Sequence, residues 1–336
     1  MPRKGGRPSV SISSLELEPL VAIDRLTKRY PAAAAGFGKP RAWVNAVNGV
    51  SFDIRSGETL GLVGESGCGK STTGQLLARL LEPTSGSIRF RGRELTTLRG
   101  REIRELRKHI QLIFQDPYAS LNPRHTIGSI LEEPLRVHRI GSRAERRQQA
   151  RDMLETVGLD RSYAARYPHE LSGGQRQRIG IARALMLRPS FVVADEPVSA
   201  LDVSVQSQIL NLLKELQRRF ALTTLFVSHD LNVVQYMSDR VAVMYLGTLV
   251  ELAPAETLFR GAVHPYTRAL LSAIPSVGAG ERRERIVLRG EVPSPLHPPA
   301  GCPFHTRCPQ AVAECASMLP DWKHVGPDHY ARCLLI

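Results

Sequence analysis

The sequence is poor in long apolar runs. Stretches such as "FVVA" at 191–194 are far shorter than the roughly 20 consecutive apolar residues that a membrane-spanning helix needs. We therefore expect that the chain does not cross a membrane by itself. Residues 1–20 carry basic side chains but lack the apolar segment of a secretory signal, so we expect a cytoplasmic chain with a disordered N-terminus.

Aromatic residues are also scarce, at 6% of the chain, whereas the formal net charge is +13. Such a charge suits an anionic partner such as a nucleotide or the anionic face of a membrane. The basic segments 89–108 and 136–151 contain almost none of the aromatic side chains on which bases stack. We therefore expect no nucleic-acid partner, and we interpret the arginines as a mostly solvated helical face.

Segments of strand type alternate with segments of helix type. Two expected strands, within 21–30 and 47–54, flank a Gly/Pro/Ala-rich loop at 31–41. Buried-type strands are expected at 191–195 and 223–228, and the helix after residue 70 should bury Leu76, Leu77, Leu80 and Leu81 on one face. This alternation predicts an α/β fold with a mostly parallel sheet, whose ligands lie at the carboxyl ends of the strands. Proline becomes more frequent after about Gly261, where we place a domain boundary.

A phosphate-binding loop is the strongest motif. The stretch "GESGCGKS" at 64–71 matches G-x-x-x-x-G-K-[ST] and lies between an expected strand and an expected helix. Glycines let successive backbone N–H groups converge on phosphate oxygens, next to the positive end of the helix. Lys70 should reach the β- and γ-phosphates, and Ser71 should bind Mg²⁺. The expected ATP contacts are Gly64, Glu65, Ser66, Gly67, Cys68, Gly69, Lys70, Ser71 and Thr72.

Acidic and amide side chains follow other apolar runs. Asp195 and Glu196 end the strand "FVVAD", and consecutive residues of a strand point to opposite faces. Asp195 is the expected magnesium ligand, and Glu196 is the expected base that activates a water. His229 follows a second strand near the γ-phosphate, and Gln115 follows a third, where it could bridge the metal and the water.

A second anion cradle lies at "LSGGQRQR", 171–178, where a serine and two glycines open a helix. The loop at 64–71 already binds the phosphates of one ATP, so the second cradle in the same chain needs another ligand. The economical explanation is a head-to-tail pair of chains. In such a pair the cradle of each chain would cap the nucleotide of the other, through Ser172, Gly173, Gly174 and Gln175.

Together these motifs, over about residues 21–251, resemble the ATP-binding subunit of an ABC transporter: Walker A "GESGCGKS", the Q-loop with Gln115, the signature "LSGGQ", Walker B "FVVADE", the D-loop "SALD" and the switch His229. The resemblance implies a P-loop NTPase fold with a mostly parallel core sheet, an antiparallel β subdomain, a helical subdomain at about 117–185 and a small C-terminal extension. It implies an ABC ATPase domain at 21–260, an extension at 261–336, and Tyr30 stacked on the adenine.

A narrower resemblance rests on "FQDPYASLNPR", "ILEEPL", "HPYTRALLSAIP" and "GEVPSPLHPPAGCPFHTRC". These stretches resemble the dipeptide/oligopeptide importer ATPases, in particular the second of their two paired subunits. The resemblance implies a partner ATPase in a heterodimer, two membrane permeases, an extracytoplasmic binding protein and a peripheral place at the cytoplasmic face of the membrane. A nickel or other small-solute importer and a soluble non-transport ABC ATPase are the alternatives.

Only five cysteines occur, and four of them, Cys302, Cys308, Cys315 and Cys333, lie in the last 35 residues. Disulfides are disfavoured in a reducing compartment, and the spacing lacks the paired C-x2-C of most zinc sites. Unligated structural thiols are a further alternative. Four thiolates can also ligate a [4Fe–4S] cluster, which the family resemblance favours.

Overall fold

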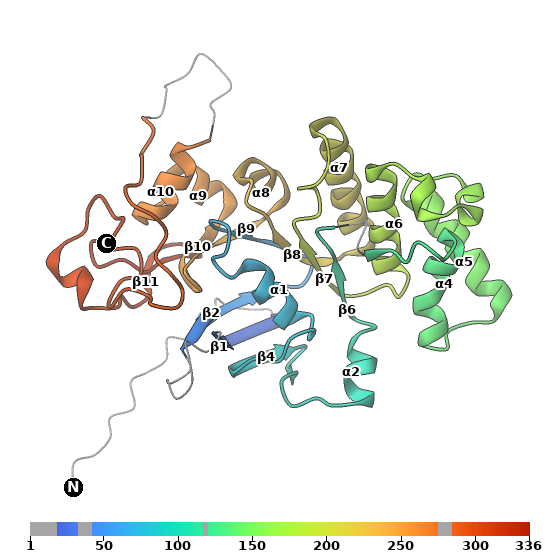
Figure 1. Cartoon of the computed structure of the whole chain (residues 1–336), viewed down its shortest axis with the longest axis horizontal. Coiled ribbons are helices and arrows are strands. Elements are labelled where there is room, and N and C mark those ends of the chain that lie inside the picture. The colour runs from blue at the N-terminus through green and yellow to red at the C-terminus, as the bar shows by residue number, and fades with distance from the viewer. Residues whose placement is uncertain (1–18, 33–41, 117–119, 275–283) are drawn as a thin grey trace, which may run out of the picture.

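The computed structural model describes residues 19–32, 42–116, 120–274 and 284–336 (Figure 1). The predicted N-terminal disorder falls almost wholly outside these residues, as do most of the 31–41 loop and the first three residues of the predicted helical subdomain. The elements are β1 Val21–Pro31, β2 Trp43–Ile54, β3 Thr59–Val63, α1 Lys70–Leu77, β4 Ser85–Phe90, β5 Arg93–Glu94, α2 Arg101–Leu106, β6 Ile110–Ile113, α4 Ile127–Val137, α5 Arg143–Thr156, η1 Arg161–Ala165, η2 Pro168–Glu170, α6 Gly173–Leu185, β7 Phe191–Asp195, α7 Val203–Phe220, β8 Thr223–Val227, α8 Leu231–Met237, β9 Arg240–Tyr245, β10 Thr248–Pro254, α9 Ala255–Gly261, α10 Pro265–Ser272, η3 Ala313–Ala316, β11 Lys323–Gly326 and β12 His329–Ala331.

The larger sheet has the strand order β11-β12-β10-β9-β3-β8-β7-β6 within the described chain. Strands β9, β3, β8, β7 and β6 run parallel, whereas β10, β12 and β11 are antiparallel to their neighbours. Every residue of β3 and β7 is buried. This is the pattern expected of parallel strands that are covered by helices on both faces, and it confirms the predicted α/β fold.

A smaller antiparallel sheet with the order β2-β1-β4-β5 packs below the larger one in Figure 1. Strands β1 and β2 pair from Val21 with Ile54 to Pro31 with Trp43, so they bracket the 33–41 segment as the sequence predicts. Side chains of this sheet share a hydrophobic cluster with α1 and with one face of β3 and β8. The small sheet thereby covers the face of the core sheet on which α1 lies.

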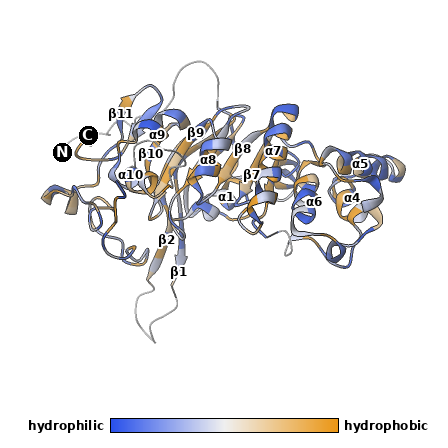
Figure 2. Cartoon of the chain, turned by 90° about the horizontal axis from the view of Figure 1, so that it is seen from above, coloured by the Kyte–Doolittle hydropathy of each residue, from blue (hydrophilic) through white to orange (hydrophobic). Residues whose placement is uncertain are grey.

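A helical arm made of α4, α5, η1 and α6 extends from the β6 end of the core sheet (Figures 1 and 2). Local sequence explains where its helices begin. Thr126 accepts a hydrogen bond at the start of α4, and Ser142 and Ser172 form capping boxes with Glu145 and Gln175 at the starts of α5 and α6. No helix in the described part of the chain is both long and apolar enough to cross a bilayer.

One sequence expectation was wrong in detail. Helix α1 ends at Leu77, and Leu76 and Leu77 are fully buried, but the side chain of Leu80 is 48% exposed. The chain leaves the helix at Ala78, and Arg79 adopts a left-handed backbone conformation with φ 52°. The helical period that relates Leu76 to Leu80 therefore does not apply beyond the first two turns.

The segment after Gly261 continues the main core. Strand β12 pairs with β10, and Cys302, Phe304 and Cys315 belong to the same hydrophobic cluster as β7 and β9. The carboxylate of Glu251, in β10, is fully buried and accepts hydrogen bonds from the backbone of Val263 (2.8 Å) and His264 (3.1 Å). It also lies 2.8 Å from Nε2 of His329 in β12. One buried acid of β10 thus joins two segments of the C-terminal part, residues 263–264 and β12, to the core.

His264 makes stability depend on pH. It is 1% exposed, its Nδ1 accepts the backbone N–H of Tyr266, and burial lowers its pKa from 6.5 to about 4. The pKa of His264 is lower in the folded chain than in the unfolded chain, so the unfolded chain binds the proton more readily. The free energy of unfolding therefore has its full value above pH 6.5, and it falls by up to about 3 kcal/mol as the pH drops towards 4. Urea unfolding at pH 7 and pH 4.5 measures it. The matched variant His264→Asn keeps a cap acceptor without titrating, so its stability should fall less; equal falls would contradict the assignment.

Candidate functional site

The loop at 64–69 joins β3 to α1 at the carboxyl edge of the core sheet. Gly64 and Gly69 have φ values of 153° and 105°, and a Cβ atom at either would collide with a backbone carbonyl oxygen, of Met244 and Ala46 respectively. Glycine is therefore required at both positions for two reasons: the backbone has a positive φ, and a neighbouring carbonyl leaves no room for a Cβ atom. The backbone N–H of Gly247, in the β9–β10 turn, donates to the carbonyl of Cys68 (2.9 Å) and fixes the loop from below.

Lys70 points back into the loop. Its ammonium donates to the carbonyl oxygens of Gly64 (2.8 Å) and Glu65 (3.1 Å), and the residue is only 5% exposed. Its neighbour Cys68 is buried, and burial raises the pKa of that thiol. The loop therefore presents one enclosed cation, the lysine, while its thiol stays protonated at neutral pH.

Ser71 and Asp195 form a pair of oxygen ligands. The Ser71 hydroxyl donates to Oδ1 of Asp195 at 2.9 Å, across the gap between the start of α1 and the end of β7. Asp195 is 6% exposed, and burial raises its pKa although the hydrogen bond from Ser71 opposes the shift. A hydroxyl and a carboxylate oxygen side by side are a hard donor set, and they fit Mg²⁺.

Glu196 lies at the centre of a second cluster. Its Oε2 accepts a hydrogen bond from Nε2 of Gln115 (2.9 Å), and its Oε1 lies 3.2 Å from Nδ1 of His229. The three side chains come from the ends of β7, β6 and β8. Glu196 has φ 46°, a left-handed conformation that is strained for a residue with a side chain. Its backbone N–H donates to the carbonyl of Val227 (3.0 Å), which holds it there.

The structure thus brings Lys70, Ser71, Asp195, Glu196, Gln115 and His229 to one edge of one sheet. A cationic phosphate cradle, a metal-type oxygen pair and a carboxylate flanked by an amide and an imidazole are the parts needed for phosphoryl transfer to water. The arrangement can bind a nucleoside triphosphate and hydrolyse it.

The signature residues lie elsewhere. Ser172 caps α6 and forms reciprocal hydrogen bonds with Gln175, whose amide also donates to the Tyr163 hydroxyl (3.1 Å). Gly173 and Gly174 pack against Leu201 and Val205, next to α7. In both views α6 lies beside α4 and α5 in the helical arm, away from α1 (Figures 1 and 2). A single chain therefore does not bring this second cradle onto its own phosphate loop.

Tyr30 is half-buried near the end of β1, where it pairs with Val44 of β2. The Lys28 ammonium lies 5.1 Å from the centre of its ring. The structure gives Tyr30 a place in the small sheet, and its predicted contact with adenine stays a prediction.

The four C-terminal cysteines gather in one corner. Cys302, Cys315 and Cys333 are buried, Cys308 is half-buried, and the Cys302 N–H donates to the Cys315 carbonyl (2.9 Å). Burial raises the pKa of the Cys302 thiol, and the three other thiols add to that shift. All are free thiols, so the disulfide alternative finds no pair. However, no three Cys, His, Asp or Glu side chains among the described residues are placed as a metal-ligand set, so these thiols as positioned do not fit a cluster.

Two contacts with the phosphate loop were missed by sequence reasoning. The Tyr266 hydroxyl accepts the backbone N–H of Glu65 (2.9 Å), and the Arg307 guanidinium contacts both carboxylate oxygens of Glu65 at 2.7 and 3.1 Å. Both partners lie about 200 residues or more from Glu65 in the chain. The only sequence signal was that "HPYT" and "FHTRC" stand out in the C-terminal region, and neither stretch indicates what it touches.

Comparison with family models gives two matches. Residues 47–199 match the family described as "ABC transporter", and residues 250–315 match "Oligopeptide/dipeptide transporter, C-terminal region". The first match spans the phosphate loop, Gln115, the signature and Glu196. The second begins in β10 and includes Tyr266, Arg307 and the first three of the clustered cysteines.

Individual relatives and a solved structure point to the same family as the two family matches. The oligopeptide transport ATP-binding protein AppF of Bacillus subtilis is 51% identical over 321 residues, which are 95% of this chain and 98% of AppF. A peptide import ATP-binding protein of Brucella ovis is 54% identical over 316 residues, 94% of this chain and 98% of its own. The structure of the ATP-binding cassette MJ0796 bound to ADP and Pi, a dimer in a post-hydrolysis state, has a TM-score of 0.62 and 32% identity, and the match covers 70% of this chain and 98% of that one.

These likenesses cover nearly the whole chain at high identity, and the catalytic-type residues lie together in the structure. The protein is an ATPase, and the chain belongs to the ATP-binding subunits of ABC transporters, in the group that carries the oligopeptide/dipeptide transporter C-terminal region.

Proposed function

We propose that this chain hydrolyses ATP to power the import of di- or oligopeptides through a membrane transporter. The observation that carries the proposal is the carboxylate of Glu196, held between Gln115 and His229 beside the phosphate loop. The peptide cargo is supported by the matched C-terminal region and by relatives that are named for peptide or oligopeptide transport.

The residues of the phosphate loop bind the triphosphate. The Lys70 ammonium exchanges the carbonyls of Gly64 and Glu65 for phosphate oxygens, which are stronger acceptors because they are charged. Ser71 and Asp195 are the residues that would hold Mg²⁺, and the bound ion neutralises charge on the phosphates. Gln115, at the end of β6, is close enough to Glu196 to contact both the metal shell and the attacking water.

Glu196 acts as the general base in this proposal. Its carboxylate accepts the proton of the attacking water, while the Gln115 amide and the His229 imidazole fix the carboxylate at both oxygens. Because Glu196 is held in a left-handed conformation at the end of a rigid strand, its position is set by the backbone. The His229 side chain is 58% exposed, and while its Nδ1 contacts Glu196, its other ring nitrogen would face the γ-phosphate.

Two ATP-binding subunits form a head-to-tail pair. Ser172, Gly173, Gly174 and Gln175 lie at the N-terminal end of α6, where backbone N–H groups and the helix dipole favour an anion. Since they lie away from the chain's own phosphate loop, a partner supplies the nucleotide they contact. The dimeric form of the related MJ0796 cassette supports a pair. We propose a heterodimer at the cytoplasmic face of the membrane, in contact with two permeases. An extracytoplasmic binding protein delivers the transported substrate to these permeases.

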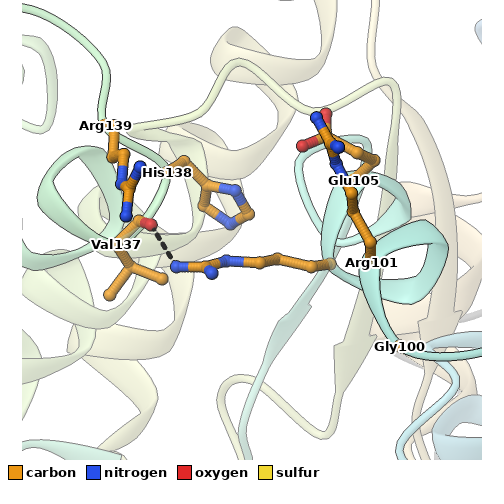
Figure 3. A pocket seen from close by; sticks show the side chains of 7 residues that line it. Gly100, Arg101, Glu105, Val137, His138 and Arg139 are labelled. Carbon is orange, nitrogen blue, oxygen red and sulfur yellow. Dashed lines mark hydrogen bonds between the residues drawn. The ribbon is translucent and has the colours of Figure 1, made fainter.

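A basic hollow of about 690 Å³ between α2 and the end of α4 is a candidate surface for the permeases (Figure 3). Arg101, Arg104 and Arg139 line it, and Arg104 donates to the Val137 carbonyl (2.6 Å), which ties the two helices together. Among the described residues that line it, Glu105 is the one acid, and it is paired with Lys108 at 2.6 Å. The hollow therefore carries net positive charge and suits an acidic partner segment or the anionic membrane face.

The four clustered thiols are proposed to bind a [4Fe–4S] cluster that stabilises the C-terminal region. The support is that Cys302, Cys308 and Cys315 pack in or against the hydrophobic core, and that Cys302 lies near enough to the other three thiols to interact with them electrostatically. Because they are not arranged as ligands in the structure, the side chains must reorient on binding. No step of ATP hydrolysis depends on this cluster.

Glu196→Gln tests the catalytic assignment. The amide keeps the shape of the side chain but cannot accept a proton, so steady-state ATPase activity should fall by about 10²- to 10⁴-fold while ATP binding is retained. Malachite-green phosphate release and equilibrium binding of ATP measure the two quantities. With ATP and the paired subunit, light scattering should show an accumulated dimer. Turnover within a few-fold of the wild type would remove Glu196 from its role.

Peptide uptake tests the cargo and the basic hollow together. In proteoliposomes with the co-encoded permeases and binding protein, the wild-type chain should drive ATP-dependent uptake of a labelled oligopeptide and not of Ni²⁺. Arg101→Glu with Arg139→Glu should leave basal ATPase unchanged and lower uptake at least tenfold, because the reversed charges repel an acidic contact. The control Arg289→Glu reverses an exposed arginine elsewhere in the chain and should have no effect. Uptake of Ni²⁺ alone would refute the peptide cargo.

Iron and acid-labile sulfide in anaerobically purified protein test the cluster. Four iron atoms per chain are expected in a [4Fe–4S] site. Cys308→Ser should lower the iron content, whereas Cys68→Ser, in the phosphate loop, should leave it unchanged. Iron far below one cluster per chain, unaffected by Cys308→Ser, would leave unligated thiols as the interpretation.

A further inference from the structure

The C-terminal region contacts the nucleotide site directly, through Glu65 of the phosphate loop. The Arg307 guanidinium forms a two-point ion pair with the Glu65 carboxylate, at 2.7 and 3.1 Å. The Arg307 side chain is 8% exposed and that of Glu65 is 26% exposed, so water screens the pair only weakly. Two parallel N–H to oxygen bonds also fix the orientation of the carboxylate, which a single contact does not.

The backbone of Glu65 is held as well. Its N–H donates to the Tyr266 hydroxyl at 2.9 Å, and its carbonyl accepts from the Cys68 N–H and from the Lys70 ammonium. Glu65 is therefore fixed on one side by the C-terminal region and on the other by the lysine that binds phosphate. A shift of Arg307 or Tyr266 would move the carbonyl to which Lys70 is bonded.

A rigid aromatic cluster supports these two contacts. Tyr266 and Tyr245 are fully buried and Phe304 is 1% exposed, and their ring centres lie 4.7 to 5.3 Å apart in edge or tilted arrangements. Phe304 and Arg307 are close in one tight turn, in which the Arg307 N–H donates to the Phe304 carbonyl (3.0 Å). The turn that carries the arginine is thus anchored in the core.

We infer that Arg307 and Tyr266 are positioning residues for ATP: they hold Glu65 so that the phosphate loop is preformed, and the C-terminal region thereby sets the affinity for nucleotide. Neither side chain contacts the reacting atoms, so the effect acts through the loop. We call the contacts of Arg307 and Tyr266 with Glu65 the clamp. The catalytic cluster follows the ends of other strands and keeps its contacts when the clamp is lost; it consists of Glu196, Gln115 and His229. The inference needs the ATPase activity of the chain and is independent of the transported cargo.

Steady-state kinetics of purified full-length variants test the inference. Arg307→Ala should raise the KM for ATP at least fivefold and change kcat less than twofold, because only loop positioning is lost. Arg307→Lys keeps the charge but cannot make two parallel hydrogen bonds, so its KM for ATP should lie between those of the wild type and of Arg307→Ala. Arg289→Ala, an exposed arginine of the same region, is the control and should match the wild type. An unchanged KM, or a fall in kcat without a change in KM, would overturn the inference.

Two further measurements decide the matter if Arg307→Ala does not fold. Tyr266→Phe removes one hydroxyl and keeps the aromatic packing, and it should raise KM about threefold. Because coupling is reciprocal, ATP should slow amide hydrogen exchange in residues 302–308 of the wild type at least twofold. That protection should be absent in Tyr266→Phe. The clamp would be structural only if two results occur together. ATP would leave amide hydrogen exchange in residues 302–308 unchanged, and Tyr266→Phe would have the wild-type KM for ATP.

Discussion

The parallel alignment of β3, β6, β7 and β8 is the constraint on which the site depends. Leu62 pairs with Val227, Ile113 pairs with Ala194, and Asp195 pairs with Val227, so these four strands end at the same level of the sheet. Neighbouring strands lie about 4.8 Å apart, and residues that follow their ends fall within a few side-chain lengths of one another. A shift of β7 by one residue would send Asp195 to the opposite face of the sheet and would displace Glu196, which follows it.

The polar network at this edge is held by backbone geometry. Glu196 has a left-handed conformation, which costs on the order of 1 kcal/mol or more for a residue with a side chain. Its N–H bond to Val227 and its contacts with Gln115 and His229 maintain that conformation. Strain of this kind is typical of a carboxylate whose direction matters, and it is offset by the packing of fully buried strands beneath.

Buried charged groups join distant parts of the chain. Glu251 links β10, the start of α10 and β12, and Glu65 links the phosphate loop to Arg307. Glu251 is fully buried, so removing one of its donors would leave an uncompensated buried group. The Glu65 side chain is 26% exposed, and its carboxylate is held by the Arg307 guanidinium at both oxygens. The C-terminal region is therefore part of the ATPase core. It adds strands to the same sheet and contacts the nucleotide loop, and a chain cut near Gly261 would lose both.

The sequence by itself determined the chemistry of the ATP site, because that chemistry is carried by local motifs. A glycine loop followed by Lys70 and Ser71, and a buried strand that ends in Asp195 and Glu196, specify strand, loop and helix over short distances. The α/β class and the strands at 21–31, 191–195 and 223–227 also follow from local patterns. The end of α1 before Leu80 did not, since burial of that side chain depends on the packing around it. Only the tertiary structure decided that Arg307 and Tyr266 reach Glu65, that the signature lies away from its own loop, and that the C-terminal thiols gather without forming a ligand set. These contacts join residues far apart in the chain, and no local spacing or periodicity encodes which distant surfaces meet.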